Sequence, residues 1–408
     1  MALVTVGLLI ALGIAEMATR IFSPHPRHVD FLIPDDRVGS LPRPDYHGRA
    51  ANMFGEYDIE IRTNHEGFRD SDFTMEDATS TRIAFLGDSF TFGEQVEESE
   101  TFVRSTEKLL RAVVPAAGIR CMNFGVGGYD THQELLCYEI FAQRYDPDVV
   151  VLMMYVHNDL IGNAFYLLDS NFGRPYFRPA MGGLEKVAAD PARLKQNHME
   201  HQQRFGGVRW YHHFHLYNLW RLFLWENRQV ARQRHLRAET GSIQDPARRL
   251  ARVWQEEDYR NYRYYAQGGA DNVVTEADRV TELLLQRLER VVREHGARFC
   301  VALLPARENL WPDRWAEYVK QLPGLEGVAM DFERPYKRVR HALPEAFTAG
   351  VILDLRETLR PADSKASIFF GRDHHYNKHG HSAVAEGLAG WLASTMGVPE
   401  RRGEARPY

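Results

Sequence analysis

The stretch from residue 83 to residue 93 reads Ile-Ala-Phe-Leu-Gly-Asp-Ser-Phe-Thr-Phe-Gly, and the fold of the whole chain can be worked out from it. Its first four residues are apolar without alternation, which is typical of a strand covered on both faces of a parallel sheet. The apolar run stops at Gly87-Asp88-Ser89, where the pattern turns into the start of a helix. A serine at this point belongs either to an ordinary turn or to a nucleophilic site at the end of a buried strand.

Four other segments have the same continuous apolar character and, with Ile83–Leu86, predict five strands: Cys121–Asn123, Val149–Tyr155, Phe299–Leu304 and Val351–Leu353. Helical patterns separate these segments at Thr101–Val114, His132–Arg144 and Thr275–His295. The last helix carries Thr275 and Asp278 as a capping pair and Gly296 as a stop. Strands that alternate with helices predict an α/β fold, a flavodoxin-like three-layer α/β/α sandwich around a central five-stranded parallel sheet.

Two regions interrupt this alternation. Residues 27–80 carry one possible strand, Tyr57–Arg62, and are expected to form an extension packed on the sheet. Residues 160–270 are an insertion rich in aromatic residues and histidine, and we expect a helical cap because a structureless loop of that length is rare. The core is then made of residues 81–159 and 271–396, and residues 1–22 form a separate segment.

That first segment is apolar from Ala2 to Ala15 except for one threonine. A membrane-spanning helix needs about 20 apolar residues, whereas the apolar part of a signal peptide has roughly 7–15. A buried core helix fits less well, because no polar stripe divides the segment. The sequence therefore predicts a membrane anchor or a cleaved signal, with the active domain outside the cytoplasm, and leaves the choice between the two open.

Composition excludes some classes of function. The 408 residues include 50 basic and 55 acidic ones, for a formal net charge of -5, so no nucleic-acid partner is expected. Three cysteines, Cys121, Cys137 and Cys300, are too few and too scattered for a disulfide framework or a thiolate zinc site.

Polar residues with a chemical role follow the predicted strands. In open α/β sheets, ligands bind beyond the carboxyl ends of the strands. The first strand is followed by a serine, the second by glycines, the third by an asparagine and the fifth, after a loop, by an Asp/His pair: Ser89, Gly127-Gly128, Asn158 and Asp373-His374-His375. A serine hydroxyl needs a histidine to take its proton, the histidine needs a carboxylate to fix its tautomer, and the oxyanion needs donors. These groups together are what acyl transfer requires.

The order and spacing of these blocks resemble those of the SGNH hydrolase superfamily, the GDSL esterases and lipases, over residues 50–395. The resemblance implies that Ser89 is the nucleophile, that His375 is the general base and that Asp373 orients it. It also implies an oxyanion hole made by the N–H groups of Ser89 and Gly128 and by the side-chain amide of Asn158. Asn377, Gly380 and His381 complete an H-x-N-x-x-G-H run similar to that of membrane-anchored members. A helix is expected from Ser382.

Three positions depart from the family pattern. Phe90 replaces the leucine of the GDSL signature, and Val156-His157 stands where a glycine usually lies two residues before the asparagine. Asp373 lies two residues before His375 instead of three. A comparable D-x-H occurs in relatives of the acetyltransferase type that modify bacterial polysaccharides.

A metal site is the chemical alternative at the last block, since His374, His375, His379 and His381 lie within eight residues and histidine ligates zinc. His375 and His379 would need a helix to share a face, and Gly380 argues against one. We therefore expect no metal and no cofactor.

The sequence predicts a membrane-tethered serine hydrolase that cleaves carboxylic esters through an acyl-enzyme, with a small ester or an acylated glycan as substrate. An O-acetyltransferase or deacetylase acting on a cell-envelope polysaccharide is the first alternative, and a non-catalytic envelope-binding protein the second. A weaker hypothesis gives the aromatic residues around His212, His213 and His215 a role in lining an acyl or sugar groove. The sequence predicts neither the ester nor the oligomeric state.

Overall fold

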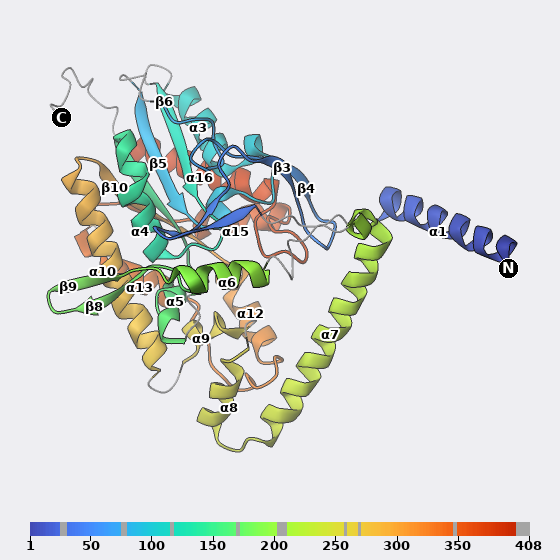
Figure 1. The fold of residues 1–408 in the computed structure, drawn as a ribbon. Coiled ribbons are helices and arrows are strands. Elements are labelled where there is room, and N and C mark those ends of the chain that lie inside the picture. The colour runs from blue at the N-terminus through green and yellow to red at the C-terminus, as the bar shows by residue number, and fades with distance from the viewer. Residues whose placement is uncertain are drawn as a thin grey trace.

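The structure is a computed structural model, and it describes residues 1–24, 31–74, 80–114, 118–168, 172–201, 210–256, 259–267, 271–345 and 349–396. At its centre lies a five-stranded sheet in the order β11-β10-β7-β5-β6, with all neighbouring strands parallel. This order is flavodoxin-like, with a topological switch point beside β5. Figure 1 labels β10, β5 and β6 of this sheet. The strands are β5 (Thr81–Gly87), β6 (Ile119–Gly125), β7 (Val149–Tyr155), β10 (Arg298–Leu304) and β11 (Ile352–Asp354). The predicted sheet and fold class are confirmed.

Helices cover both faces of the sheet. Along β5, Ala84 and Leu86 join one buried cluster, while Ile83 and Phe85 join another, as the two-residue period of a strand requires. The first cluster is completed by α4 (Thr131–Ile140), α10 (Asn272–Glu294) and α13 (Arg334–Ala342), and the second by α3 (Phe102–Val113), α15 (Arg356–Lys365) and α16 (Lys378–Met396). Both faces are therefore buried, which explains why the strands are apolar without alternation.

The remaining elements lie outside this sandwich. They are α1 (Ala2–Phe22), α2 (Ser89–Phe92), α5 (Asp159–Gly162), α6 (Pro191–His201), α7 (His215–Ser242), α8 (Pro246–Val253), α9 (Tyr262–Tyr265), α11 (Arg307–Leu310) and α12 (Pro312–Val319). Three antiparallel hairpins join β1 (Leu32–Asp35) to β2 (Gly39–Pro42), β3 (His47–Ala51) to β4 (Asp58–Arg62), and β8 (Tyr176–Ala180) to β9 (Gly183–Val187). Of these strands only β4 was predicted.

Two helix starts differ from the prediction. The helix α10 begins at Asn272, because the Asp271 carboxylate accepts hydrogen bonds from the amides of Val273 and Val274. The predicted cap at Thr275 and Asp278 is wrong, since both residues lie inside the helix. The helix α16 begins at Lys378 and not at Ser382, because Asn377 Oδ1 accepts from the amides of His379 and Gly380.

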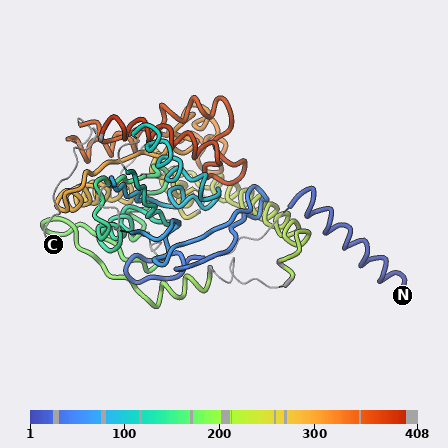
Figure 2. Tube along the Cα trace, turned by 90° about the horizontal axis from the view of Figure 1, so that it is seen from above, coloured from blue at the N-terminus to red at the C-terminus, as the bar shows by residue number. Residues whose placement is uncertain are grey.

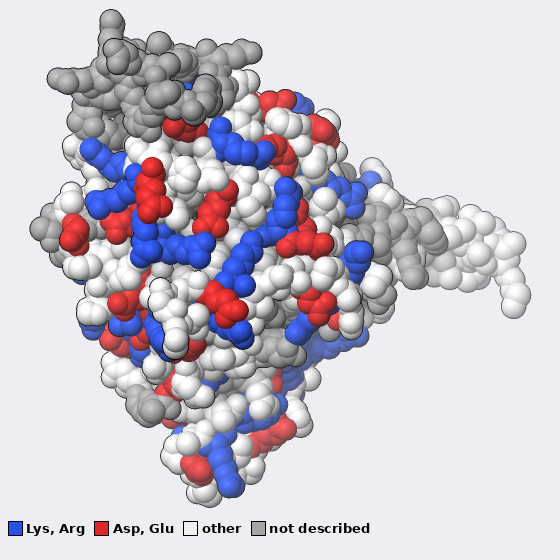
Figure 3. All heavy atoms as spheres, turned by 60° about the vertical axis from the view of Figure 1, so that its left-hand side comes forward, with Lys and Arg blue, Asp and Glu red and all other residues white. Residues whose placement is uncertain are grey.

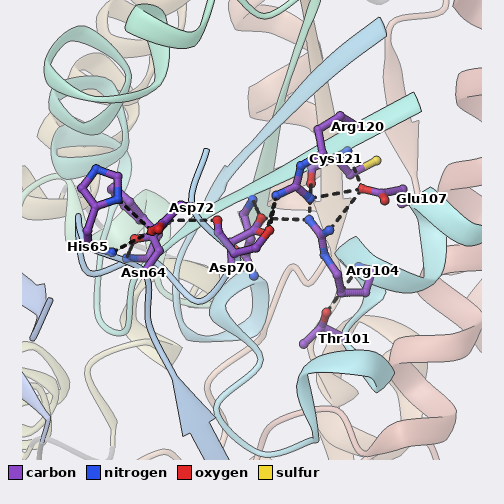
Figure 4. A network of polar contacts seen from close by, with 12 residues as sticks. Asn64, His65, Asp70, Asp72, Thr101, Arg104, Glu107, Arg120 and Cys121 are labelled. Carbon is purple, nitrogen blue, oxygen red and sulfur yellow. Dashed lines mark hydrogen bonds and ion pairs between the residues drawn. The ribbon is translucent and has the colours of Figure 1, made fainter. Parts of the chain in front are cut away.

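The segment before β5 is attached to the sandwich through two buried charged residues. The Asp70 carboxylate accepts from Arg104 on α3 at 2.8 Å and from Arg120 on β6 at 2.6 Å, as Figure 4 shows. Arg69 is 1% exposed and donates to the carbonyl oxygens of Gly93 and Val96. Because Gly93 ends α2, the N-terminal segment helps to hold the short helix that begins at Ser89.

The insertion between β7 and α10 contains the β8–β9 hairpin and further helices, of which α7 is the longest. In Figure 1, α7 runs along the side of the body from which α1 projects, and Figure 2 shows the same arrangement from above. Among the described residues, α1 is the one helix that is long and apolar enough to cross a membrane, with a mean hydropathy of 2.0 over an 18-residue window. On the face shown in Figure 3, basic and acidic side chains are interspersed.

Candidate active site

Ser89, His375 and Asp373 form a continuous hydrogen-bonded chain. Ser89 Oγ lies 2.7 Å from His375 Nε2, and His375 Nδ1 lies 2.6 Å from Asp373 Oδ1. The same carboxylate oxygen accepts from the His375 backbone amide at 2.9 Å. Since a carboxylate only accepts, the proton of a neutral imidazole is on Nδ1, which leaves the Nε2 lone pair toward the serine hydroxyl. This is the arrangement in which a histidine removes a proton from a serine.

The charges of this chain favour an ion pair between the carboxylate and the imidazole. Burial alone would raise the pKa of Asp373, but its hydrogen bonds and attraction to His375 lower the pKa to about 2. Burial would likewise lower the pKa of His375, but the hydrogen bond and charge of Asp373, with smaller contributions from Asp88 and Glu94, raise it above its ordinary value. The histidine is therefore a stronger base than a free imidazole.

The Gly-Asp-Ser sequence is explained by close packing at the end of β5. A side chain at Gly87 would place its Cβ 2.1 Å from Thr91 Oγ1, so the approach of α2 to the strand requires glycine. Asp88 caps α2 by accepting from the Phe90 amide at 2.9 Å. Gly93 ends the helix with φ 74°, a conformation that favours glycine. Ser89 is consequently held as the first residue of a short helix at the carboxyl end of the sheet.

Asn158 and Gly128 lie on the loops that follow β7 and β6. Asn158 Nδ2 donates to Asp88 Oδ2 at 3.2 Å, which joins the loop after β7 to the loop that carries Ser89. Gly128 has φ 76°, and its carbonyl oxygen accepts from Arg174 Nη1 at 2.6 Å. Both residues line one cavity of about 290 Å³. The structure therefore brings Asn158 and Ser89 together through Asp88, and Gly128 and Asn158 together through the cavity.

The rest of this cavity is lined by aromatic and polar side chains. Tyr166 and Tyr176 stack with ring centres 4.7 Å apart, and Arg174, Arg260 and Asn261 are also in the lining. Planar rings beside charged and amide groups are a suitable lining for a ligand with both apolar faces and hydroxyl groups. The aromatic residues near His213 are absent from this lining, and the side chain of His212 lies outside the described part of the chain.

The departure at Val156 has a packing reason, since this side chain is 1% exposed in the core, and His157 beside it is packed as well. Its ring contacts Tyr155, Tyr262 and Tyr265, and its Nδ1 lies 3.3 Å from the Tyr265 hydroxyl. Burial lowers the pKa of His157, so it stays neutral as part of this aromatic cluster. The turn itself is kept, because the Asn158 amide donates to the Tyr155 carbonyl oxygen at 3.3 Å.

The other histidines of the last block lie apart from Ser89. His381 is fully buried in α16, its Nδ1 accepts from the Phe102 amide, and burial lowers its pKa to about 3. His374 and His379 are exposed. Gly380 lies inside α16, so the expectation that it would prevent a helix is wrong; His375 instead precedes the helix. Within the described part of the chain, no three His, Cys, Asp or Glu residues are grouped to hold a metal ion.

Two residues at the site were missed by sequence reasoning. The Glu56 carboxylate accepts from the amide of Arg372 at 2.7 Å and from that of Asp373 at 2.9 Å, so it holds the loop that carries the acid. No local pattern marks Glu56, because its role depends on a contact with a loop 316 residues away. Asp88 belongs to the Gly-Asp-Ser motif itself. An aspartate directly before the first residue of a helix is a typical N-cap, and this pattern would have identified it.

Asp88 is also one of three buried carboxyl groups behind the serine, with Glu134 and Asp159. Burial raises the pKa of Asp88 to about 6 and that of the other two well above the ordinary range. Asp159 Oδ2 accepts from the Tyr155 amide at 2.7 Å. At a pH below the pKa of Asp88 the group is therefore largely uncharged, which limits the negative potential next to Ser89.

Residues 264–406 match the SGNH hydrolase-like domain of the acetyltransferase AlgX family. Among curated protein sequences, none matches this chain. A two-domain esterase active on acetylated mannans superposes with a TM-score of 0.37 and 12% identity, over 79% of this chain and 52% of its own, so this chain spans about half its length.

An acetyl xylan esterase superposes with a TM-score of 0.36 and 12% identity, over 75% of this chain and 97% of its own. An acetylxylan esterase from Geobacillus stearothermophilus gives a TM-score of 0.34 and 14% identity, over 80% and 98%. Likeness at these scores is too low to support an argument about function. The domain match includes the Asp373–His375 block, which follows α15, while the other three blocks follow β5, β6 and β7 in chain order. The part of the chain from residue 264 to residue 406, which holds Asp373 and His375, is therefore similar to the SGNH hydrolase-like domain of that family.

Proposed function

We propose that the protein cleaves carboxylic esters through an acyl-enzyme on Ser89. The observation that supports this most strongly is the hydrogen-bonded chain from Ser89 Oγ through the His375 ring to Asp373. Ser89 Oγ attacks the ester carbonyl carbon while His375 Nε2 takes its proton. The tetrahedral oxyanion accepts from the Ser89 and Gly128 amides and from Asn158 Nδ2. His375 then gives the proton to the leaving alcohol, and water repeats the sequence to release the acid.

Asn158 has a second task in this scheme. One of its two amide hydrogens is directed to Asp88, so the side chain is already fixed when the oxyanion forms. A donor held in place before the reaction stabilises the transition state without reorganisation at that moment. We infer that Asp88 is a positioning residue for Asn158 as well as the cap of α2.

The substrate we propose is an acylated glycan, with acetyl as the acyl group. The cavity next to Asn158 combines stacked tyrosines with arginine and amide groups, which suit the apolar faces and the hydroxyl groups of a sugar. The relatives named above act on acetylated mannans and xylans, which agrees with this choice but does not carry it.

The test of the reaction is the substitution Ser89→Ala, measured on 4-nitrophenyl acetate and on acetylated xylo-oligosaccharides. We expect a loss of about 10⁵–10⁶-fold in kcat, as in other serine hydrolases. Ser364→Ala, at an exposed serine of α15, is the matched control and should keep full activity. A serine-directed fluorophosphonate should label the native protein and the control but not the Ser89→Ala variant; near-normal turnover in that variant would refute the proposal.

A second activity, transfer of the acetyl group to a glycan hydroxyl, is favoured by the match of residues 264–406 to an acetyltransferase family. The same acyl-enzyme serves both reactions, and the acceptor decides between them. Adding a deacetylated xylo- or manno-oligosaccharide to the 4-nitrophenyl acetate assay separates them. A transferase forms acetylated oligosaccharide faster than free acetate, whereas a hydrolase releases acetate at an unchanged rate.

For localisation we propose attachment to a membrane through α1. An 18-residue window of this 21-residue helix has a mean hydropathy of 2.0 and is only 11% buried against the rest of the chain. A helix of this length extends about 30 Å, which is the thickness of the hydrocarbon core. The body that carries Ser89 then lies outside the bilayer.

A further inference from the structure

The helix α1 is built into the fold by a contact with the start of α7. The Glu16 carboxylate accepts from the amides of His215 and Leu216, each at 2.9 Å. Arg20 Nε donates to Glu16 at 2.6 Å, and Arg20 Nη2 donates to the His213 carbonyl oxygen at 2.7 Å. Glu16 is only 9% exposed. It therefore caps a 28-residue helix that begins 199 residues away in the chain.

This contact argues against removal of α1 as a signal peptide. The first amides of a helix have no partner within the helix, and a side chain that accepts from them typically contributes about 1 kcal/mol. The residue before α7, Phe214, has no side-chain oxygen, and α7 has no side-chain cap of its own. Cleavage on the carboxyl side of Glu16 would remove the carboxylate that α7 uses.

An exposed aromatic stripe follows the contact of α7 with α1. It consists of Trp220 and Phe223, which lie three residues apart in α7. Trp220 and Phe223 are 54% and 60% exposed, and the Trp220 ring lies 5.8 Å from the ring of Tyr217, which is only partly exposed. Residues three apart are neighbours on a helix surface, so these two rings form one exposed apolar patch.

The position of the stripe relative to α1 identifies its partner. Glu16 lies six residues before the end of α1 at Phe22, which is about 9 Å along the helix axis. Glu16 is also the first charged residue after the apolar run Ala2–Ala15, so when that run lies in the bilayer, the first turn of α7 lies at the boundary between the hydrocarbon and the headgroups. Tryptophan and tyrosine are enriched at that depth, and helices with an exposed aromatic side lie in the interface plane. In both Figure 1 and Figure 2, α7 lies on the side of the body from which α1 projects.

We propose that α1 is retained as an anchor and that the aromatic stripe of α7 docks on the interface of the same bilayer. This proposal rests on the membrane attachment proposed above and adds a second, peripheral contact to it. The occupant is the lipid interface and not a second copy of the chain, because the stripe follows the contact of α7 with α1, the only described helix that is apolar enough to span a membrane.

The following turn of α7 reaches the active-site loop. Trp225 packs edge-on against Phe54 with ring centres 5.6 Å apart. Glu226 accepts from Arg372 Nη1 at 2.5 Å, and Arg372 directly precedes Asp373. Docking of α7 on lipid would therefore fix the distance between the bilayer and the loop that carries the acid. The active site would then work on substrate held at a constant height above the membrane.

The test uses the full chain in nanodiscs that contain lipid with a nitroxide at the fifth carbon of the acyl chain. Single cysteines introduced by Leu8→Cys, Phe223→Cys and Met181→Cys are labelled with an environment-sensitive fluorophore; the three native cysteines are buried. Met181, between the strands of the β8–β9 hairpin, is fully exposed and serves as control. We expect at least a two-fold loss of fluorescence at positions 8 and 223, and none at 181 beyond that in nitroxide-free discs.

Each other outcome has a definite meaning. Quenching at position 8 but not at 223 overturns the docking of α7 and leaves the anchor in place. No quenching at position 8 overturns both. Quenching at 223 by a nitroxide-labelled second copy in detergent would assign the stripe to self-association and overturn the lipid assignment.

Retention of α1 is read separately, by mass spectrometry of protein taken from the membranes of a secreting host. A peptide that contains both Ala15 and Glu16 supports retention, and its absence overturns that part of the proposal. Fluorophosphonate labelling of Ser89 shows that each variant is folded, so failure of the esterase proposal is distinguished from failure of the membrane proposal.

Discussion

The substitution Asp373→Asn separates the charge of the acid from its role in holding the histidine. One oxygen, Oδ1, accepts from both the Nδ1 and the backbone amide of His375. An asparagine can keep both hydrogen bonds with its amide oxygen, so the tautomer of His375 is preserved and only the negative charge is lost. Asp373→Ala removes the charge and both hydrogen bonds.

The size of the charge effect follows from the pKa of Asp373. The carboxyl pKa falls from 3.8 to about 2, although its side chain is 14% exposed and burial opposes the change. At 1.36 kcal/mol for each pKa unit, this difference amounts to about 2 kcal/mol, or roughly 30-fold to 60-fold in rate if the imidazolium of the transition state gains it all. We expect Asp373→Asn to lose about that factor in kcat/KM, and Asp373→Ala to lose roughly ten times more because the histidine is no longer oriented.

The pH profile gives a second readout with a fixed sign. Catalysis needs His375 neutral, so kcat/KM rises with pH through the His375 pKa. Asp373 raises that pKa, and its removal therefore moves the rise to lower pH. The assay is 4-nitrophenyl acetate hydrolysis across the acid-to-alkaline range, with Asp36→Asn, at an exposed carboxylate, as control. An unchanged profile together with an unchanged rate in both variants would show that Asp373 does not act on His375.

The packing around the site gives three further predictions. Glu56→Ala should lower kcat about 5-fold to 20-fold with little change in KM, because the backbone amides of Arg372 and Asp373 lose their acceptor. Glu56→Gln keeps one side-chain oxygen and should lose less activity. Equal changes in KM and kcat would contradict a positioning role. Gly380→Ala should lower the free energy of unfolding, measured in urea, by about 1–3 kcal/mol, because the added Cβ would lie 2.4 Å from the Ile368 carbonyl oxygen. Gly390→Ala, where a Cβ would meet no atom within 4 Å, should raise the free energy of unfolding by up to about 1 kcal/mol. Asp88→Asn removes a carboxyl group whose pKa is raised by burial from 3.8 to about 6. In the wild type, the stability that this group contributes is fully present below pH 3.8 and is lost as the pH rises through about 6, so the variant should gain up to about 3 kcal/mol of unfolding free energy relative to the wild type over that interval. A difference in urea unfolding that stays constant with pH would rule this out.

Sequence reasoning predicted the sheet because the central part of β5, β6, β7 and β10 is buried on both faces and is therefore a nearly continuous apolar run. It predicted the Ser89, Asn158 and His375 loops because parallel strands bring their carboxyl ends to one edge. It failed at the start of α10, where Asp271 competes with Thr275 as cap and lies earlier in the chain. The hairpins β1–β2, β3–β4 and β8–β9 were missed except for β4, because short strands that are only partly buried lack a continuous apolar run.

The parts of the site that could not be predicted depend on contacts between distant segments. Glu56 meets the Asp373 loop, and Arg69 meets the end of α2, through tertiary packing that leaves no local trace in the sequence. The division of the chain at residues 22, 80, 160 and 270 stays a prediction. The roles of Gly128 and Asn158 in the oxyanion hole also stay predictions.

The pairing of β7 with β10 joins the two halves of the chain, since the strands stay in register from Val149 to Tyr155 across the insertion. Ser89 belongs to the first half, and Asp373 and His375 belong to the second. Between them, Gly182 and Gly183 at the tip of the β8–β9 hairpin are so open that a Cβ at either position would meet no atom within 4 Å. A chain divided at this tip yields two polypeptides, neither of which contains a complete triad. Ester hydrolysis would then report their reassembly, and the fold offers a natural point at which to build a split reporter.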